Sequence, residues 1–214
     1  MTAVEPLPER ARELLREGLA RLGLALDAAQ RERLLAYLAL LLRWNRAYNL
    51  TAVREPVQMV PRHLLDSLAI LPWLRGDAVL DLGSGAGLPG IPLAVARPRT
   101  AFTLLDASLK KTRFLRQACR ELGLARVAVV RARAEDYAPA RPFPTVVARA
   151  VAGAGALAGL AGPLLAPGGR LLVMAGRRPA RPGLPAGFAL QEVVPLQVPG
   201  LGAARHLLVV ARRP

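Results

Sequence analysis

From residue 77 onward, short apolar runs alternate with segments of helical periodicity, and this alternation is the strongest constraint on the fold. The runs AVLDL, AFTLLD, RVAVV, PTVVARAV and GRLLVMA are predicted to be strands. Strands that alternate with helices predict a parallel sheet with helices on both faces. The last two runs, ALQEVVPLQV and HLLVVA, are separated by the short link PGLGAA and must therefore pair as an antiparallel hairpin. We expect an α/β, Rossmann-like fold with a seven-stranded, mostly parallel sheet and an antiparallel edge hairpin.

Helical patterns fill the intervals between the first five predicted strands. They are LPGIPLAVARP, SLKKTRFLRQACRELGL, a short segment around AEDYA, and GAGALAGLAGPLLA. The last of these, at 152–166, is rich in glycine, and each interior glycine costs on the order of 1 kcal/mol relative to alanine. We expect this helix to be irregular or frayed.

The N-terminal segment has the leucine spacing of amphipathic helices. PERARELLREGLARLGL and AAQRERLLAYLALLLRWNRAYNL each repeat leucine every three or four residues, and Asp27 is a plausible cap for the second helix. A third helix is expected over Pro61–Leu74, with Pro61 in its first turn. We predict an N-terminal helical extension at 1–75, packed on a main domain at 76–214.

A glycine-rich stretch, DLGSGAGLPGIP, follows the first predicted strand. Gly85, Gly87 and Gly90 satisfy the dinucleotide fingerprint G-x-G-x-x-G, and Asp106 lies about 20 residues further on, as that fingerprint expects. Taken alone, this pattern would predict a nicotinamide cofactor and an oxidoreductase. A Walker loop is excluded because the chain contains no G-x-x-x-x-G-K-[ST] motif.

Two features of the same stretch argue against a diphosphate ligand. Asp81 precedes the glycines and would repel phosphate, and Pro89 and Pro92 remove backbone N–H groups from the start of the following helix. A ligand that carries an amino group and a sulfonium would instead be attracted by the acid, and S-adenosylmethionine is such a ligand. Asp106 would then accept hydrogen bonds from the ribose hydroxyls. Ala134 and Glu135, after the third strand, would lie along the edge of the adenine ring.

The charge balance predicts a polyanionic partner. Thirty Lys and Arg residues against fifteen Asp and Glu residues give a formal net charge of +15. Nucleic acid is the first expectation and an acidic membrane surface the second. Aromatic residues make up only 4% of the chain, which disfavours RNA-binding domains built on stacking platforms. We expect phosphate contacts to dominate, with affinity that falls steeply as salt rises.

Other sequence features exclude several classes of protein. Cys119 is the only cysteine, so neither an intrachain disulfide nor a thiolate metal cluster can form, and no metal site is predicted. The N-terminus has no signal-peptide pattern. The longest uncharged stretch, at 150–169, is too weakly hydrophobic to be a membrane span. We expect a cytoplasmic protein with no membrane partner.

Several motifs together resemble one family. DLGSGAGLPGIP, LLDASLKKTRFL, RARAED, VVARAV, WNRAYNLTAV, RHLLDSL and RHLLVV are similar to segments of the RsmG (GidB) family of bacterial small-subunit rRNA methyltransferases. The resemblance implies a class I S-adenosylmethionine-dependent methyltransferase that methylates guanine N7 at position 527, in the 530 loop of 16S rRNA. By position, it implies cofactor contacts from Gly83, Leu88, Asp106, Ala134, Glu135 and Arg149. With Asp81, Gly85 and Gly87 these residues make up the predicted site.

The implied chemistry agrees with the residues that the chain lacks. Guanine N7 carries an in-plane lone pair, so no proton has to be removed and the enzyme needs only to orient the reactants. No N/D-P-P-Y-like motif follows the fourth strand, and no cysteine lies beyond it to attack a pyrimidine C5. No catalytic base is therefore predicted. Ala175 stands where many relatives have a lysine, and Arg177 or Arg178 would replace it.

Five further residues each have a structural and a functional interpretation. His63 and Asp66 would share a helix face and could form a general base pair, although packing or capping is the simpler role. Asn45 and Asn49 are expected to order a loop. Arg149 is expected to contact the cofactor or to position the substrate, and the alternative is an ion pair with Glu135 or Asp136.

The expected partner is 16S rRNA, either free or within the 30S subunit or an assembly intermediate, and the enzyme is expected to be a monomer. The basic residues predicted beside the carboxyl ends of the strands are Arg62, Lys110, Lys111, Arg113, Arg149, Arg177, Arg178 and Arg181. The alternative functions are a methyltransferase acting on another RNA, a small molecule or a protein, an NAD-dependent oxidoreductase, and a non-catalytic RNA-binding protein.

Overall fold

The computed structural model describes residues 7–149, 153–176 and 183–213. Within these ranges one seven-stranded sheet has the order β3-β2-β1-β4-β5-β7-β6. Its strands are β1 (Ala78–Leu82), β2 (Ala101–Leu105), β3 (Val127–Val130), β4 (Phe143–Arg149), β5 (Leu165–Ala175), β6 (Phe188–Pro195) and β7 (His206–Arg212). The first five are parallel, and β7 pairs antiparallel with both β5 and β6. The predicted sheet with its antiparallel edge hairpin is confirmed.

The strand order reverses between β1 and β4. The chain moves outward from β1 to β2 and β3, and then returns to place β4 on the other side of β1. Asp81 of β1 is in register with Val147 of β4, and Leu82 with Leu105 of β2. In open α/β sheets a ligand binds in the crevice at the carboxyl ends of the strands where the order reverses. The glycine-rich stretch follows β1 at this point.

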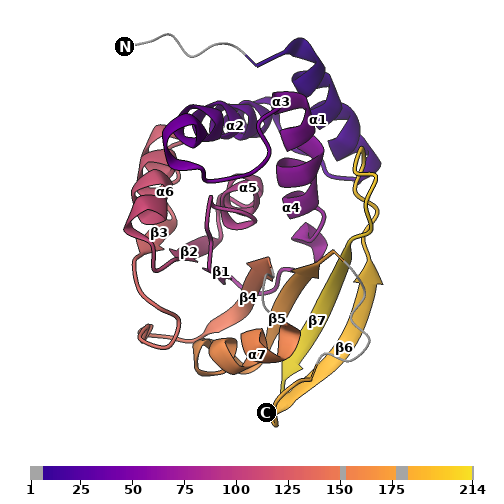
Figure 1. Ribbon diagram of the computed structural model, residues 1–214. Helices are drawn as coiled ribbons and strands as arrows, with labels where there is room; N and C mark the ends of the chain where they lie inside the picture. The colour runs from indigo at the N-terminus through magenta and orange to yellow at the C-terminus, as the bar shows by residue number, and fades with distance from the viewer. Residues whose placement is uncertain (1–6, 150–152, 177–182, 214) are drawn as a thin grey trace.

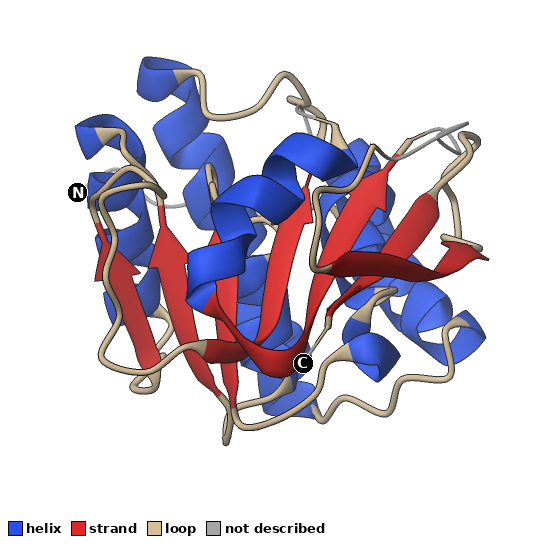
Figure 2. Cartoon of the chain, turned by 90° about the horizontal axis from the view of Figure 1, so that it is seen from below, coloured by secondary structure: helices blue, strands red, loops and turns tan. Residues whose placement is uncertain are grey.

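Helices cover the two faces of the sheet unequally (Figures 1 and 2). They are α1 (Glu9–Arg21), α2 (Ala28–Tyr48), α3 (Pro56–Met59), α4 (Asp66–Leu68), α5 (Gly90–Ala96), α6 (Leu109–Glu121) and α7 (Ala154–Ala161). Alternate strand residues point to opposite faces, so Val79 joins the core under α2, α5 and α6, while Leu80 joins the core under α7. The expectation of helices on both faces is confirmed.

The N-terminal helices share a core with α5 and α6. Asp27 caps α2 as expected: its carboxylate accepts from the Gln30 backbone N–H at 2.7 Å, and the Gln30 side chain accepts from the Asp27 N–H at 2.9 Å. The Gln30 amide also donates to the carbonyls of Val95 and Ala96 at the end of α5. The division of the chain at residue 75 stays a prediction, because one hydrophobic core spans it.

The prediction of a third helix over Pro61–Leu74 is wrong in its start and its regularity. The helical segment begins at Pro56 and continues as a π-helix, η1 (Val60–Leu65), before α4 and a 3-10 turn, η2 (Leu71–Trp73). Pro61 is therefore interior and not in the first turn. Proline has no N–H to donate within a helix, and the wider π turn lies at this interruption.

Two other predicted helices differ from the structure. The AEDYA segment forms a turn at Ala134–Asp136 instead of a helix, so the described connection from β3 to β4 is a loop. The glycine-rich helix, α7, begins at Ala154 and ends at Ala161 in a 3-10 turn, η3 (Gly162–Leu164), and β5 starts directly after it. Gly155 and Gly159 lie within a continuous α-helix, so the described irregularity is limited to the 3-10 turn at its end, and residue 152 lies outside the described ranges. None of the helices in the described ranges is long and apolar enough to cross a membrane.

Candidate functional site

The glycine loop is tied to the neighbouring strand by its backbone. The N–H groups of Gly83 and Ser84 both donate to the carbonyl of Leu105, at 2.9 and 3.0 Å. Gly87 has a φ of +86°, and a Cβ there would lie 2.4 Å from Cδ1 of Ile91. Glycine is therefore required at this position both by the backbone conformation and by the packing. The result is a fixed loop at the carboxyl end of β1, with Gly83 exposed.

Asp81 is fully buried beneath this loop. One carboxylate oxygen, Oδ2, accepts from the Gly90 N–H at 3.0 Å, and a Cβ on Gly90 would lie 2.5 Å from that oxygen. The other oxygen, Oδ1, has no hydrogen-bond partner among the described residues. Burial raises the pKa of Asp81 to about 7, against the opposing effect of the Gly90 N–H. The structure thus places Asp81 behind the loop, where its charge can act on a ligand only through space.

The start of α5 offers no free N–H group to a phosphate. The Gly90 N–H is taken by Asp81, the Ile91 N–H donates to the Gly87 carbonyl at 2.8 Å, and Pro92 has none. Helix N-termini bind anions through such free groups. This geometry supports the argument against a diphosphate ligand, although the G-x-G-x-x-G pattern is present.

Asp106 connects the end of β2 to the glycine loop. Its Oδ2 accepts from the Gly85 N–H and its Oδ1 from the Ser108 N–H, each at 2.9 Å. Ser108 in turn caps α6, accepting from the Lys111 N–H. The Lys111 ammonium lies 3.5 Å from Oδ2. Asp106 therefore holds together the loop, the strand end and the helix start, and its contact with a ribose stays a prediction.

Tyr37 is a site residue that the sequence analysis missed. Its hydroxyl, fully buried on α2, donates to the carbonyl of Ala86 in the glycine loop at 2.7 Å. Burial raises the pKa of Tyr37 far above its usual range, so the hydroxyl keeps its proton and stays a donor. The one available signal was a tyrosine within the leucine-rich LLAYLALLL, because a buried hydroxyl needs a partner.

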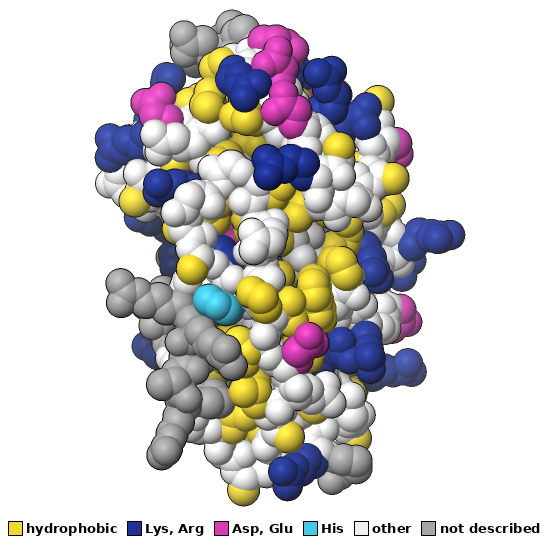
Figure 3. Space-filling model, turned by 90° about the vertical axis from the view of Figure 1, so that its right-hand side faces the viewer, with side chains coloured by type: hydrophobic (Ala, Val, Ile, Leu, Met, Phe, Trp, Pro, Cys, Tyr) yellow, Lys and Arg dark blue, Asp and Glu magenta, His cyan; other side chains and the backbone are white. Residues whose placement is uncertain are grey.

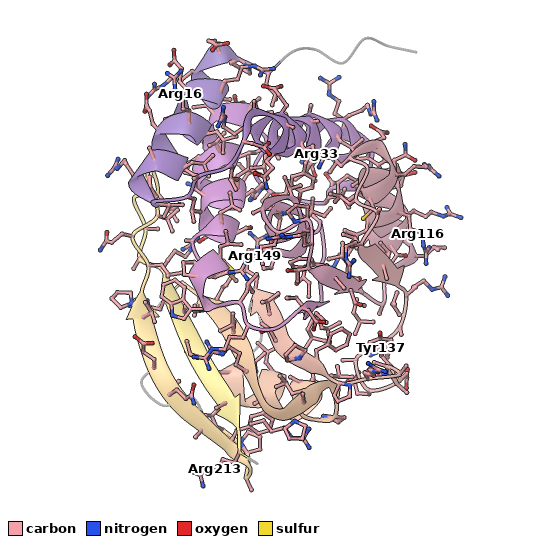
Figure 4. All side chains as sticks on the ribbon, turned by 180° about the vertical axis from the view of Figure 1, so that it is seen from behind. Arg16, Arg33, Arg116, Tyr137, Arg149 and Arg213 are labelled. Atoms are coloured by element: carbon pink, nitrogen blue, oxygen red, sulfur yellow. The ribbon has the colours of Figure 1, made fainter. Side chains whose placement is uncertain are left out.

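Arg149 ends β4 beside this loop and is exposed. Its positive charge acts on Tyr37, His63, Asp66 and Asp81, so the guanidinium lies among groups from both the N-terminal helices and β1. Figure 4 shows it near the middle of the molecule. The alternative ion pair with Glu135 or Asp136 is not formed among the described residues. Arg149 is thus a cation presented at the carboxyl edge of the sheet.

The remaining predicted cofactor residues lie around the same edge with different exposures. Leu88 is buried in the core below the loop, at 2% exposure, so any contact with a ligand would come from its backbone. Ala134 is half-buried and Glu135 exposed in the turn after β3. The roles of these residues, and of Gly83 and Gly85, stay predictions. No cluster of His, Cys, Asp or Glu in the described part of the chain could hold a metal ion.

Comparison with known proteins identifies the family. Residues 30–208 match the family model GidB, rRNA small subunit methyltransferase G. A ribosomal RNA small subunit methyltransferase G from Marinobacter nauticus is 52% identical over 200 residues, covering 92% of this chain and 94% of that protein. One from Alkalilimnicola ehrlichii is 52% identical over 196 residues, covering 91% and 89%. The chain belongs to the GidB family.

Solved structures agree with the fold of this GidB-family chain. The glycopeptide N-methyltransferase MtfA, in complex with S-adenosylmethionine, matches with a TM-score of 0.57 at 19% identity, covering 71% of this chain and 95% of MtfA. The yhhF protein from Escherichia coli matches with a TM-score of 0.55 at 17% identity, covering 70% of this chain and 86% of that protein. These similarities establish the Rossmann-like methyltransferase fold.

A polar network orders the loop that follows α2 in this GidB-family chain. The Asn45 side chain donates to the Thr51 carbonyl and accepts from the Thr51 N–H, both at 2.9 Å. The Thr51 hydroxyl lies 2.9 Å from Nε2 of His63. Asn49 ends α2 in the left-handed region, with a φ of +48°. Both asparagines thus have the loop-ordering role expected of them.

His63 and Asp66 are both buried but have different partners. Burial lowers the pKa of His63 to about 4, so its ring is neutral at physiological pH. Asp66, 2% exposed, accepts from Nε of Arg205 at 3.1 Å. Burial raises the pKa of Asp66 although Arg205 opposes this effect. The structure supports packing roles for these two residues and shows no general base pair.

The described basic residues predicted near the carboxyl edge are exposed or half-buried. They are Arg62, Lys110, Lys111, Arg113 and Arg149. Arg177, Arg178 and Arg181 lie outside the described ranges, so the replacement for the lysine missing at Ala175 is not placed. Figure 3 shows the face over α1 and the β6–β7 edge. Lys and Arg side chains are dispersed there among hydrophobic and acidic ones.

Proposed function

We propose that this chain transfers the methyl group of S-adenosylmethionine to N7 of the guanine at position 527, in the 530 loop of 16S rRNA. The observation that carries the proposal is membership of the GidB family over residues 30–208, which include the glycine loop and its contacts. The relatives at about half identity are named ribosomal RNA small subunit methyltransferase G.

The residues at the carboxyl edge fit this cofactor. S-adenosylmethionine supplies an electrophilic methyl group on a positively charged sulfur. Asp81 and Asp106 place two carboxyl groups at the loop, and the start of α5 has no N–H group left for a phosphate. We assign the cofactor to Asp81, Gly83, Gly85, Gly87, Leu88, Asp106, Ala134, Glu135 and Arg149.

The remaining task of the protein is to orient the guanine. Because N7 already has a free lone pair, holding it in line with the methyl group is the main contribution. His63 is a weak base, because burial lowers its pKa to about 4, and Asp66 is paired with Arg205; both agree with a mechanism that needs no general base. Arg149 is free of carboxylate partners within the described residues and would position the substrate through its phosphate or base edge.

The partner in this proposal is 16S rRNA, free or within a 30S subunit or an assembly intermediate, and the enzyme works as a monomer. Bacterial ribosomal RNA is assembled in the cytoplasm, which would be the place of action. The net charge of +15 supports a polyanionic substrate bound largely through phosphate contacts.

The test is a methyl-transfer assay with radiolabelled S-adenosylmethionine. Naked 16S rRNA and 30S subunits from cells that lack the modification serve as substrates. Borohydride reduction followed by aniline cleavage then maps N7-methylguanine along the RNA. We expect one cleavage site, at the predicted guanine. Cofactor binding without label on either form of RNA would contradict the proposal, and label on another atom would revise the acceptor.

A further inference from the structure

The last turn of α2 presents an aromatic ring to solvent. Tyr48 is 39% exposed, and its ring stacks on that of Trp44 with centroids 5.1 Å apart and planes inclined by 28°. A single exposed tyrosine is ordinary on a protein surface. This one is supported from beneath by a second ring and leaves part of its own surface open.

The pair is anchored to the hydrophobic core by further aromatic contacts. Trp44 meets Phe114 of α6 edge-on, with centroids 5.6 Å apart, and Phe114 also contacts Tyr37 at 6.4 Å. Phe114 and Tyr37 are fully buried. Aromatic contacts thus run from the core to Tyr48, so the exposed ring is held in place before any ligand arrives. A preorganised ring loses little conformational entropy on binding.

Tyr48 lies beside the site at the carboxyl edge of the sheet. Thr51 lies three residues further on, and its hydroxyl contacts the ring of His63. The positive charge of Arg149 contributes to the lowered pKa of His63. Three residues of chain span at most roughly 10 Å, so Tyr48 lies within about this distance of Thr51 and its contact with His63. Figure 1 shows this loop leaving α2 and crossing in front of α5, above the ends of the strands.

The surroundings of the ring favour a polyanion. No Asp or Glu occurs between Glu32 and Glu55, whereas this interval contains Arg33, Arg43, Arg46 and Arg54. Arg43 pairs with Glu121 of α6 at 3.0 Å. Arg46 and Arg54 are exposed on either side of Tyr48 in the sequence. Lys110 and Arg113 are exposed on α6, the helix that carries Phe114. A partly exposed aromatic ring among cations matches a nucleic acid base with its neighbouring phosphates.

We propose that Tyr48 stacks on an unpaired base of the RNA substrate, next to the nucleotide that is methylated, while Arg46 and Arg54 meet the adjacent phosphates. This inference rests on the proposed function and names the surface by which the substrate is held. It also refines the expectation drawn from low aromatic content: a single anchored ring contributes stacking within an interface dominated by phosphate contacts.

The test compares variants of Tyr48 in RNA binding at several salt concentrations. The RNA is a 16S rRNA fragment that spans the 530 loop, and a fully paired duplex of equal length is the comparison. We expect Tyr48→Leu to raise the Kd for the fragment by roughly 10-fold at every salt concentration, leaving the slope of log K against log salt unchanged. Arg54→Gln should instead reduce that slope by about one.

Two control variants separate the ring from other causes. Tyr48→Phe keeps the ring and should bind as the wild type does. Leu190→Ala removes a similarly exposed hydrophobic side chain from β6, 36% exposed, and should also leave binding unchanged. Tyr48→Leu should leave duplex binding and the Kd for S-adenosylmethionine unchanged. A Tyr48→Leu protein with wild-type affinity for the fragment, or a Tyr48→Phe protein that loses as much as Tyr48→Leu, overturns the inference.

A second measurement needs no substitution at Tyr48. In a Trp73→Phe background Trp44 is the only tryptophan, and its emission should fall when the fragment saturates the protein but not with the duplex. Equal emission with and without the fragment overturns the inference. If the wild type neither binds nor methylates 16S rRNA, the proposed function fails together with the inference. An active enzyme that is indifferent to Tyr48→Leu contradicts only the stacking role.

Discussion

The hydroxyl of Tyr37 donates a 2.7 Å hydrogen bond to the carbonyl of Ala86, so a helix of the N-terminal segment directly supports the glycine loop. Tyr37→Phe removes the donor and leaves a buried carbonyl unsatisfied, at a cost of about 1–3 kcal/mol of unfolding free energy. We expect a weaker affinity for S-adenosylmethionine as well, measured by calorimetry. Tyr48→Phe, which loses only an exposed hydroxyl, is the control for stability and cofactor binding. Equal cofactor affinity in Tyr37→Phe and wild type would show that the loop does not depend on this contact.

The raised pKa of Asp81 predicts an unusual dependence of the free energy of unfolding on pH. Because its pKa is raised from 3.8 to about 7, the folded protein holds a proton between these values that the unfolded chain has lost. The contribution of Asp81 to stability is therefore full below pH 4 and is lost as pH rises through 7, amounting to roughly 4 kcal/mol. His63, with its pKa lowered to about 4, acts in the opposite direction between pH 4 and 6.5.

Asp81→Asn isolates the effect, because His63 is present in both proteins. Urea unfolding at a series of pH values should show the variant gaining stability relative to the wild type from pH 4 to pH 8. A cationic cofactor favours the ionised carboxylate, so wild-type affinity for S-adenosylmethionine should rise with pH up to about 7, and the affinity of the variant should not. Parallel curves for the two proteins would mean that Asp81 does not titrate in this range.

We expect even an isosteric substitution of Asp106 to weaken cofactor binding. Its two oxygens accept from the N–H groups of Gly85 and Ser108, and the amide of Asn can supply only one acceptor. In Asp106→Asn the side-chain NH₂ would face a backbone N–H, and we expect at least about a 10-fold loss of cofactor affinity. Asp136→Asn, an exposed change in the turn after β3, is the matched control. A loss of similar size in both variants would indicate an effect of net charge and not of the two hydrogen bonds that Asp106 accepts.

The ion pair between Asp66 and Arg205 joins segments 139 residues apart. Arg205→Met would leave Asp66 buried without its cation, which costs about 3 kcal/mol at pH 8. The cost should shrink at pH 5, because protonation of Asp66, whose pKa burial already raises, removes the uncompensated charge. Chemical unfolding at both pH values measures the difference. Arg213→Met, at an exposed position after β7, should change stability by less than about 0.5 kcal/mol.

Local patterns predicted those features whose causes are local. The cap at Asp27 needs only Gln30 three residues away, and the alternation of apolar runs with helical periods predicts a parallel sheet whatever the partners are. The glycine loop after β1 was recognisable because Gly87 requires a conformation that other residues rarely adopt. The irregular course around Pro61 was not recognised, because the pattern could not show that the helix already began at Pro56.

The sequence by itself determined the sheet, the loop at its switch point and the residue types suited to a cationic cofactor. Only the tertiary structure decided that Asp81 lies behind the loop, that Tyr37 reaches Ala86, and that Tyr48 remains at the surface. The physical reason is that periodicity and capping depend on neighbours in the chain. Burial, hydrogen-bond partners and pKa values depend on which distant segments pack together.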